Sequence, residues 1–497
     1  MYFPDFGEFE RLAGQGNLIP VSREIVADLE TPVSAFAKLE HDARHAFLLE
    51  SVEGGEKWAR YSFLGADTGL TYRIAGDTVE IDRDGRVERF AGEADPFARL
   101  RALLARVKPV RLPGMPLFCG GAVGYIGYEA VRFFERFPPV PAGEGGEDAA
   151  FLFTDTLVVF DNLRHRLRVI SNASIPPGAD RAALEAAYRT ACERIDRIVA
   201  RLRTPVLPRA LLSSGTSGRI RVTPRTDRER FMALVERAKA YVRAGDVFQV
   251  VLSQRFDVDC EASPFDVYRG LRVVNPSPYM FFLRLGSRTL IGSSPEVMVR
   301  LNDGQVELRP IAGTRPRGSD EASDAALEAE LRANEKERAE HVMLVDLGRN
   351  DVGRVAALGT VRVDELMTVE RYSHVMHLVS NVRGRLADGL DAFDVLRAAF
   401  PAGTVTGAPK VRAMEIIHEL EAAERGPYAG AVGYISFAGN MDLCITIRTL
   451  VHERGRYWVQ AGAGIVADSD PAAEHQECAN KARALLRAAE VAQSGFQ

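Results

Sequence analysis

Short apolar segments joined by tight turns constrain this fold more than any other feature of the sequence. Residues 279–285 and 288–291 are two such segments, and only Gly286-Ser287 separates them, which is typical of a β-hairpin. Residues 157–161 and 166–170 form a second pair of the same kind. Helical patterns alternate with these strands, but a hairpin joins antiparallel strands. The sequence therefore predicts a mixed α/β chain and argues against a purely parallel sheet.

The chain is long enough for more than one domain, with 497 residues of which 46% are hydrophobic. Residues 179–203 show the 3.6-residue period of a long amphipathic helix. Residues 204–218 follow it and are rich in Pro, Ser and Gly, as linkers are. We therefore predict an N-terminal domain of residues 1–210 and a C-terminal domain of residues 219–497.

Composition excludes several classes of partner. The net charge is −5, so there is no basic field for nucleic acid. No apolar run reaches the roughly 18 residues of a membrane span, and the acidic start MYFPDFGEFE does not resemble a secretory signal. The five cysteines are scattered without a CxxC pair, which indicates reduced thiols. We expect a cytoplasmic protein.

Two helical patterns carry carboxylates in unusual places. Glu340 shares a predicted helix face with Met343, Leu344 and Leu347, where an unpaired carboxylate costs several kcal/mol. In the C-terminal helix, Glu474, Glu477 and Lys481 fall on one face. Each pattern also has an ordinary explanation. In the first, Glu340 lies at the edge of the apolar stripe and pairs with an arginine. In the second, the carboxylates of the C-terminal helix form a solvated acidic face. Together, the carboxylates of the two helices would provide oxygen ligands for a hard cation, and oxygen ligands favour Mg²⁺ over zinc.

Three further features have two explanations each. Residues 443–448 alternate like a strand, so Arg448 is either an ordinary exposed side chain or a group that binds a carboxylate. Gly462-Ala463-Gly464 after a strand is either a turn or a place where backbone amides approach an anion. His377 is either a structural histidine or a group that handles protons.

Taken together, the second half of the chain resembles the chorismate-utilising enzymes. The motifs that carry this resemblance are RPIAGTRPRG at 309–318, EHVMLVDLGRND at 340–351, VMHLV at 375–379, FPAGTVTGAPK at 400–410 and AGAGI at 461–465. The N-terminal half resembles the partner domain of anthranilate synthase large subunits through residues 48–51 and 120–128. This implies an α+β fold of stacked, mostly antiparallel β-sheets flanked by helices, with the two domains interleaved.

The resemblance also assigns roles to residues. Glu340 and Glu477 match magnesium ligands. Glu296 matches the acid that protonates the departing C4 hydroxyl of chorismate, and His377 and Thr404 match residues near the reacting ring. The chorismate-binding positions are matched by Gly313, Thr314, Tyr428, Arg448, Gly462, Ala463 and Gly464.

Two positions distinguish the activities within this family. Relatives that add water resemble this chain but have a lysine base where Gln249 stands, and an amide is not a base. Aminodeoxychorismate synthases commonly have a nucleophilic lysine where this chain has Ala312. Both positions favour addition of ammonia at C2 and loss of pyruvate to give anthranilate. The alternatives are an aminodeoxychorismate synthase and a catalytically inactive tryptophan-binding homologue.

The resemblance implies partners as well. No glutamine amidotransferase domain is recognisable, so ammonia is expected from a separate glutaminase subunit in a heterotetramer. Feedback inhibition by tryptophan is expected, in which case the N-terminal domain is regulatory and the C-terminal domain catalytic. The residues that match the tryptophan site are Glu50, Ser51, Pro278, Tyr279 and Met280. These residue types suit tryptophan, because a carboxylate can bind its ammonium group and an aromatic ring and a thioether can pack around its indole.

Overall fold

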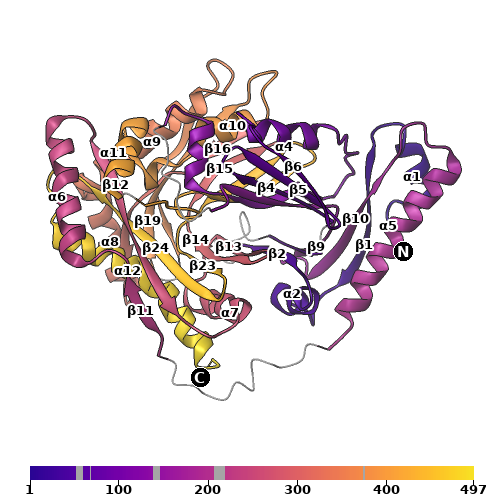
Figure 1. Ribbon diagram of the computed structural model, residues 1–497, viewed down its shortest axis with the longest axis horizontal. Helices are drawn as coiled ribbons and strands as arrows, with labels where there is room; N and C mark the ends of the chain where they lie inside the picture. The colour runs from indigo at the N-terminus through magenta and orange to yellow at the C-terminus, as the bar shows by residue number, and fades with distance from the viewer. Residues whose placement is uncertain are drawn as a thin grey trace.

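Two large β-sheets form the framework of the protein (Figure 1). The structure is a computed structural model that describes residues 1–51, 60–67, 69–137, 146–205, 219–372, 375–421 and 423–496. Within these ranges each sheet has 12 strands, and all neighbouring strands are antiparallel. The predicted fold class is therefore confirmed.

The first sheet begins with strands of the N-terminal half and continues with strands of the C-terminal half. Its order is β1 (Leu18–Val26), β10 (Arg166–Ser174), β9 (Thr156–Asp161), β3 (Tyr61–Ala66), β2 (His45–Glu50), β13 (Tyr279–Leu285), β14 (Arg288–Ser294), β23 (Thr449–Glu453), β24 (Arg456–Ile465), β12 (Gln249–Asp259) and β11 (Arg221–Pro224), with β20 (Gly407–Ala408) also on β12. The two halves meet where β2 pairs with β13, with Met280 opposite Glu50.

The second sheet is shared in the same way. Its order is β17 (Ile311–Pro316), β19 (Val375–Arg385), β16 (Gln305–Leu308), β15 (Val297–Asn302), β22 (Met441–Ile445), β21 (Ala431–Ser436), β7 (Gly121–Ile126), β8 (Ala149–Thr154), β4 (Leu70–Ala75), β5 (Thr78–Arg83) and β6 (Arg86–Phe90), with β18 (Arg362–Arg371) also on β19. Here the halves meet where β21 pairs with β7.

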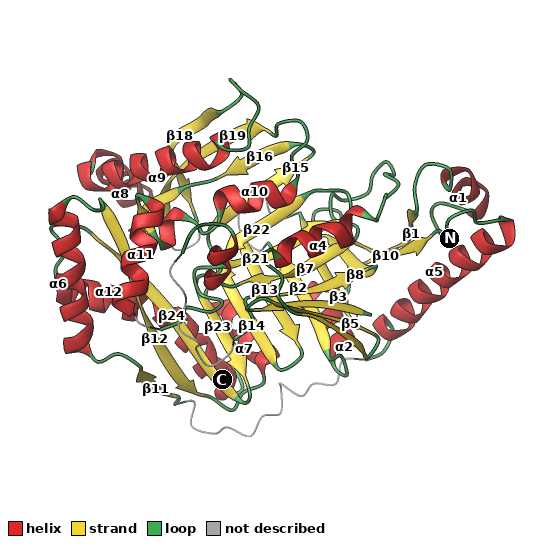
Figure 2. Ribbon diagram, turned by 45° about the horizontal axis from the view of Figure 1, so that its top comes forward, coloured by secondary structure: helices red, strands yellow, loops and turns green. Residues whose placement is uncertain are grey.

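A hydrophobic core lies between the two sheets. It contains Phe47 and Phe281 from the first sheet and Tyr125 and Tyr434 from the second. Successive side chains of a strand point to opposite faces, so Phe282, next to Phe281, packs into another core under helices. Figure 2 shows helices on the outer sides of the strands. The sheets are thus stacked face to face and covered outside.

The helices have clear start signals. They are α1 (Phe6–Leu12), α2 (Pro32–Glu40), α4 (Pro96–Ala105), α5 (Arg181–Leu202), α6 (Arg228–Ala244), α7 (Pro264–Val274), α8 (Glu321–Ala333), α9 (Glu335–Gly353), α10 (Ala392–Ala399), α11 (Lys410–Glu421) and α12 (Pro471–Gln493), with 3-10 turns η1 (Tyr128–Phe133) and η3 (Gly403–Val405). The Asp470 side chain caps α12 by accepting from the amide of Ala473 at 2.8 Å. No helix in the described ranges is long and apolar enough to cross a membrane.

Both predicted hairpins are present, as β9–β10 and β13–β14. The predicted helix at 179–203 is α5. The predicted domain boundary falls within residues 206–218, which lie outside the described residues.

Candidate active site

A buried acid marks the centre of the candidate site. Glu296 lies between β14 and β15, and only 5% of it is exposed. The Thr404 hydroxyl, in η3, donates to Glu296 Oε1 at 2.7 Å. Burial raises the pKa of Glu296 to about 8, although the Thr404 hydrogen bond opposes the shift. Glu296 is therefore a neutral carboxylic acid near pH 7, able to give a proton to a leaving group.

His377 lies beside Thr314 because β17 and β19 pair with a bulge at Gly313. The register shifts between Ala312 and Thr314, and Gly313 has a φ of 67° that suits glycine. His377 Nδ1 is 3.0 Å from Thr314 Oγ1 and 3.2 Å from the Gly313 carbonyl oxygen. A carbonyl only accepts, so Nδ1 carries the proton and Nε2 keeps a lone pair. Burial lowers the pKa of His377, which favours this neutral form.

Arg448 corrects one prediction. The strand predicted over 443–448 ends at Ile445, and Arg448 lies in the connection to β23 with a φ of 50°. Burial lowers the pKa of its guanidinium, whose charge in turn lowers the pKa of His377. No described residue forms a hydrogen bond or ion pair with this guanidinium. A half-buried arginine in this state is suited to binding a carboxylate.

The small residues of Gly462-Ala463-Gly464 are needed for close packing. They lie within β24, paired with β12, and not in a turn. A side chain at Gly462 would place its Cβ 2.6 Å from the Tyr428 hydroxyl. At Gly464 the Cβ would be 2.1 Å from Gln249 Nε2. The two glycines thus leave room for the buried Tyr428 and Gln249 beside the strand.

Glu340 on α9 contacts this region, and α12 carries the carboxylates Glu474 and Glu477. Glu340 Oε1 accepts a hydrogen bond from Gln249 Nε2 at 3.2 Å, and its charge helps to raise the pKa of Glu296. On α12, Glu474 is buried, and burial raises its pKa. The side chain of Glu477 is 48% exposed and pairs with Lys481 at 2.7 Å. The charge of Lys481 also acts on Glu296, so both helices lie near the acid.

Comparison with known proteins shows the family to which the chain belongs. Residues 47–487 match the family described as chorismate binding enzyme. Anthranilate synthase component 1 from Acetivibrio thermocellus is 48% identical over 495 residues, which cover 99% of each chain. The component 1 protein from Pseudomonas aeruginosa is also 48% identical, over 499 residues and 99% of each chain. The chain belongs to the anthranilate synthase component 1 family of chorismate-binding enzymes.

A solved structure agrees with this membership. The crystal structure of anthranilate synthase component I from Streptococcus pneumoniae TIGR4 superposes with a TM-score of 0.76 at 37% identity. The superposition covers 93% of this chain and 99% of that chain. The family and enzyme class predicted from the motifs are therefore confirmed.

In this anthranilate synthase component 1 homologue, a cavity separate from the Glu296 site is lined by all the residues predicted to bind tryptophan. We call it the second cavity. The cavity has a volume of about 420 Å³ and lies at the junction of β2 and β13. Its lining includes Glu50, Ser51, Pro278, Tyr279 and Met280, together with Tyr61, Phe63 and Tyr434. The structure also shows that the carboxylate of Glu50 accepts from the Tyr268 hydroxyl and from Arg272.

Two contacts of this family member were not predicted from the sequence. Lys481 Nζ donates to the Gly462 carbonyl oxygen at 2.8 Å, which ties α12 to β24. The ring of Tyr372 packs edge-on against His377, with 5.7 Å between centroids. The sequence pattern places Lys481 only on the same helix face as Glu474 and Glu477. Neither contact has a signal in the local sequence, because each joins segments that pair only in the folded chain.

Proposed function

We propose that this chain converts chorismate and ammonia to anthranilate and pyruvate, with Glu296 as the acid. The observation that carries the proposal is the buried, neutral Glu296 hydrogen-bonded to Thr404. Chorismate must lose hydroxide from C4, a poor leaving group, and an acid that is protonated near pH 7 makes that loss possible.

The other residues fit the same reaction. Arg448 would bind a carboxylate of chorismate, since its guanidinium is half-buried and no described residue pairs with it. Gln249 and Ala312 supply neither a base for water nor a nucleophile of their own, which leaves C2 to ammonia. His377 Nε2 is free to take the C2 proton when pyruvate leaves and the ring becomes aromatic.

Glu340 and Glu477 are suited to holding Mg²⁺. The described residues contain no group of three or more potential ligands, so the protein alone would not enclose a metal ion. Two carboxylates from different helices fit Mg²⁺, which usually binds one or two protein carboxylates and shares its other positions with substrate and water. When bound at the ring carboxylate, Mg²⁺ would act as a Lewis acid that withdraws electron density from the ring.

Two further parts of the proposal concern regulation and partners. We expect tryptophan to bind in the second cavity, supported by its aromatic lining and its position where the two halves of the chain pair. Inhibition requires tryptophan to bind an inactive arrangement better than the active one. We also expect a separate glutaminase subunit in a heterotetramer, and a cytoplasmic location in keeping with the five unpaired cysteines.

The test is a product assay on the purified chain. Chorismate, MgCl₂ and an ammonium salt should give fluorescent anthranilate, and glutamine should replace ammonium only when a glutaminase subunit is added. A Glu296→Gln variant should lose activity, and Glu415→Gln, at a half-exposed glutamate of α11 that pairs with Arg412, should keep it. Aminodeoxychorismate, isochorismate or no product at all from the wild-type chain would refute the proposal.

A further inference from the structure

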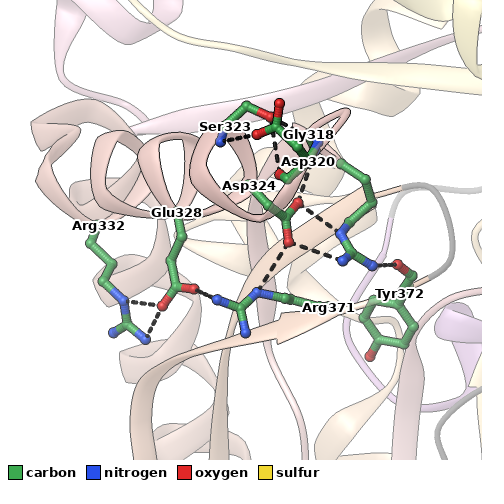
Figure 3. Close-up of polar contacts among 9 residues, drawn as sticks. Gly318, Asp320, Ser323, Asp324, Glu328, Arg332, Arg371 and Tyr372 are labelled. Atoms are coloured by element: carbon green, nitrogen blue, oxygen red, sulfur yellow. Dashed lines mark hydrogen bonds and ion pairs between the residues drawn. The ribbon is translucent and has the colours of Figure 1, made fainter.

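One carboxylate on α8 holds the chain on both sides of the strand that carries His377. Asp324 accepts two hydrogen bonds from Arg317, each 2.9 Å long, and one from the Gly318 amide at 2.8 Å. Its other neighbour is Arg371, whose Nε is 3.5 Å from Asp324 Oδ2 (Figure 3).

These partners flank the start of β19. There, β19 pairs with β17 on one side, with Thr314 opposite His377, and with β18 on the other, with Glu370 opposite His377. Arg317 follows the last residue of β17, and Arg371 is the last residue of β18. Asp324 therefore contacts the ends of both strands that border His377, and Glu328 on the same helix also pairs with Arg371.

A second route leads from Asp324 to the histidine ring. Arg317 Nη1 donates to the Tyr372 carbonyl oxygen at 2.6 Å, and the ring of Tyr372 packs against His377. The backbone amide of Tyr372 also donates to the Val375 carbonyl oxygen at 2.8 Å, which links the end of β18 to the start of β19. The same arginine that Asp324 binds thus supports the residue in contact with the ring.

The local sequence is adapted to this contact. On α8 only Asp324 and Leu331 are buried, so the helix exposes most of its side chains but buries an acid. A Cβ at Gly318 would lie 2.3 Å from the Asp324 amide nitrogen, so only glycine permits the approach. The hydrogen bonds from Arg317 and Gly318 lower the pKa of Asp324 to about 2, which keeps it charged at neutral pH.

We propose that Asp324 is a positioning residue, which sets His377 and Thr314 in their reactive geometry through Arg317 and Arg371. The inference rests on the proposed function, in which His377 removes a proton during the loss of pyruvate. Misplacing a reacting group by about 1 Å can cost about a hundredfold in rate. Loosening this contact should therefore slow the second chemical step and leave substrate binding by Arg448 largely intact.

The test compares Asp324→Asn with Arg371→Gln and with a control, Asp320→Ala. Asn keeps the shape of the side chain, and the Arg371 side chain is 49% exposed, so its replacement should not prevent folding. Asp320→Ala removes the capping side chain of α8 and touches neither arginine. The readouts are kcat, KM for chorismate, and the ratio of the unaromatised amine adduct to anthranilate, measured by mass spectrometry.

We expect Asp324→Asn to lower kcat by about tenfold or more, with little change in KM, and to raise the share of the amine adduct. Arg371→Gln should act in the same direction, and Asp320→Ala should keep the wild-type product ratio. An unchanged ratio in Asp324→Asn, or the same change in Asp320→Ala, would overturn the proposal, because α8 would then matter only as a folded helix.

A second measurement separates this inference from the proposed function. Diethyl pyrocarbonate modifies imidazole rings without turnover, and peptide mass mapping locates the modified residue. His377 should react faster in Asp324→Asn than in the wild type, because its ring would be less firmly held against Thr314. Faster modification in a chain that makes no anthranilate would refute the proposed function alone, and equal rates would refute the positioning role.

Discussion

Replacing Glu296 by glutamine should abolish catalysis and stabilise the protein, and the gain should depend on pH. Glutamine has nearly the same shape, and its carbonyl oxygen can still accept the Thr404 hydrogen bond. It cannot donate a proton as an acid, so kcat should fall by about 10²–10⁴-fold.

The size of the stability effect follows from the shifted pKa. The pKa of Glu296 rises from its ordinary value of 4.5 to about 8 in the folded protein. The folded state therefore binds this proton more tightly than the unfolded state, and stability is lost as pH rises from 4.5 to about 8. Each pH unit in this window costs about 1.4 kcal/mol, which amounts to about 3 kcal/mol at pH 7. Glutamine does not titrate and avoids this cost.

The measurement is urea or thermal unfolding of both proteins at several pH values. Near pH 4.5 their stabilities should be similar, and the advantage of Glu296→Gln should grow until the pH reaches about 8. The kcat/KM of the wild type for chorismate, at saturating free ammonia, should fall above the same pH as the acid ionises. A stability difference that does not change with pH would show that Glu296 is not held as a buried neutral acid.

Three other variants test the remaining parts of the site. Glu340→Gln should nearly abolish turnover without unfolding the chain, because it removes one anionic ligand from Mg²⁺; full activity at ordinary magnesium concentrations would exclude Glu340 as a ligand. Gly462→Ala should raise KM for chorismate strongly, since its Cβ would lie 2.6 Å from the Tyr428 hydroxyl, and unchanged kinetics would contradict this packing. Ser51→Phe should fill the second cavity and relieve inhibition by tryptophan, with anthranilate formation unchanged. Calorimetry would measure tryptophan binding and kinetic assays its inhibition. Normal inhibition of this variant would place the tryptophan site elsewhere.

Local patterns predicted the local structure well. Gly286-Ser287 forms the turn between β13 and β14, so this hairpin could be predicted from residues that are adjacent in the sequence. The sequence from about Asp324 to Asp346 has one continuous helical pattern, but the structure divides it into α8 and α9 at Asn334, whose side chain caps α9 by accepting from the Glu337 amide. Asparagine is tolerated within a helix and preferred at a cap, so periodicity alone did not reveal the break.

Long-range features were beyond the reach of periodicity. Alternation placed Arg448 on a strand, but the backbone turns to a positive φ there, and only the packed structure imposes that conformation. The contact between Gln249 and Glu340 joins residues far apart in the chain. The family motifs supplied the candidate roles because they record such contacts, but they gave no sign of the Asp324 network.

The shared construction of both sheets has a consequence for any attempt to divide this protein. A fragment that ended between the two halves would expose β2 and β7 as unpaired edges, and the complementary fragment would expose β13 and β21. Exposed hydrophobic edges pair readily with foreign strands, so each fragment expressed alone should aggregate. Coexpressed fragments should become soluble only when they associate through these strand pairs. A recombinant chain that takes one half from a distant relative would have to preserve the strand register at both junctions.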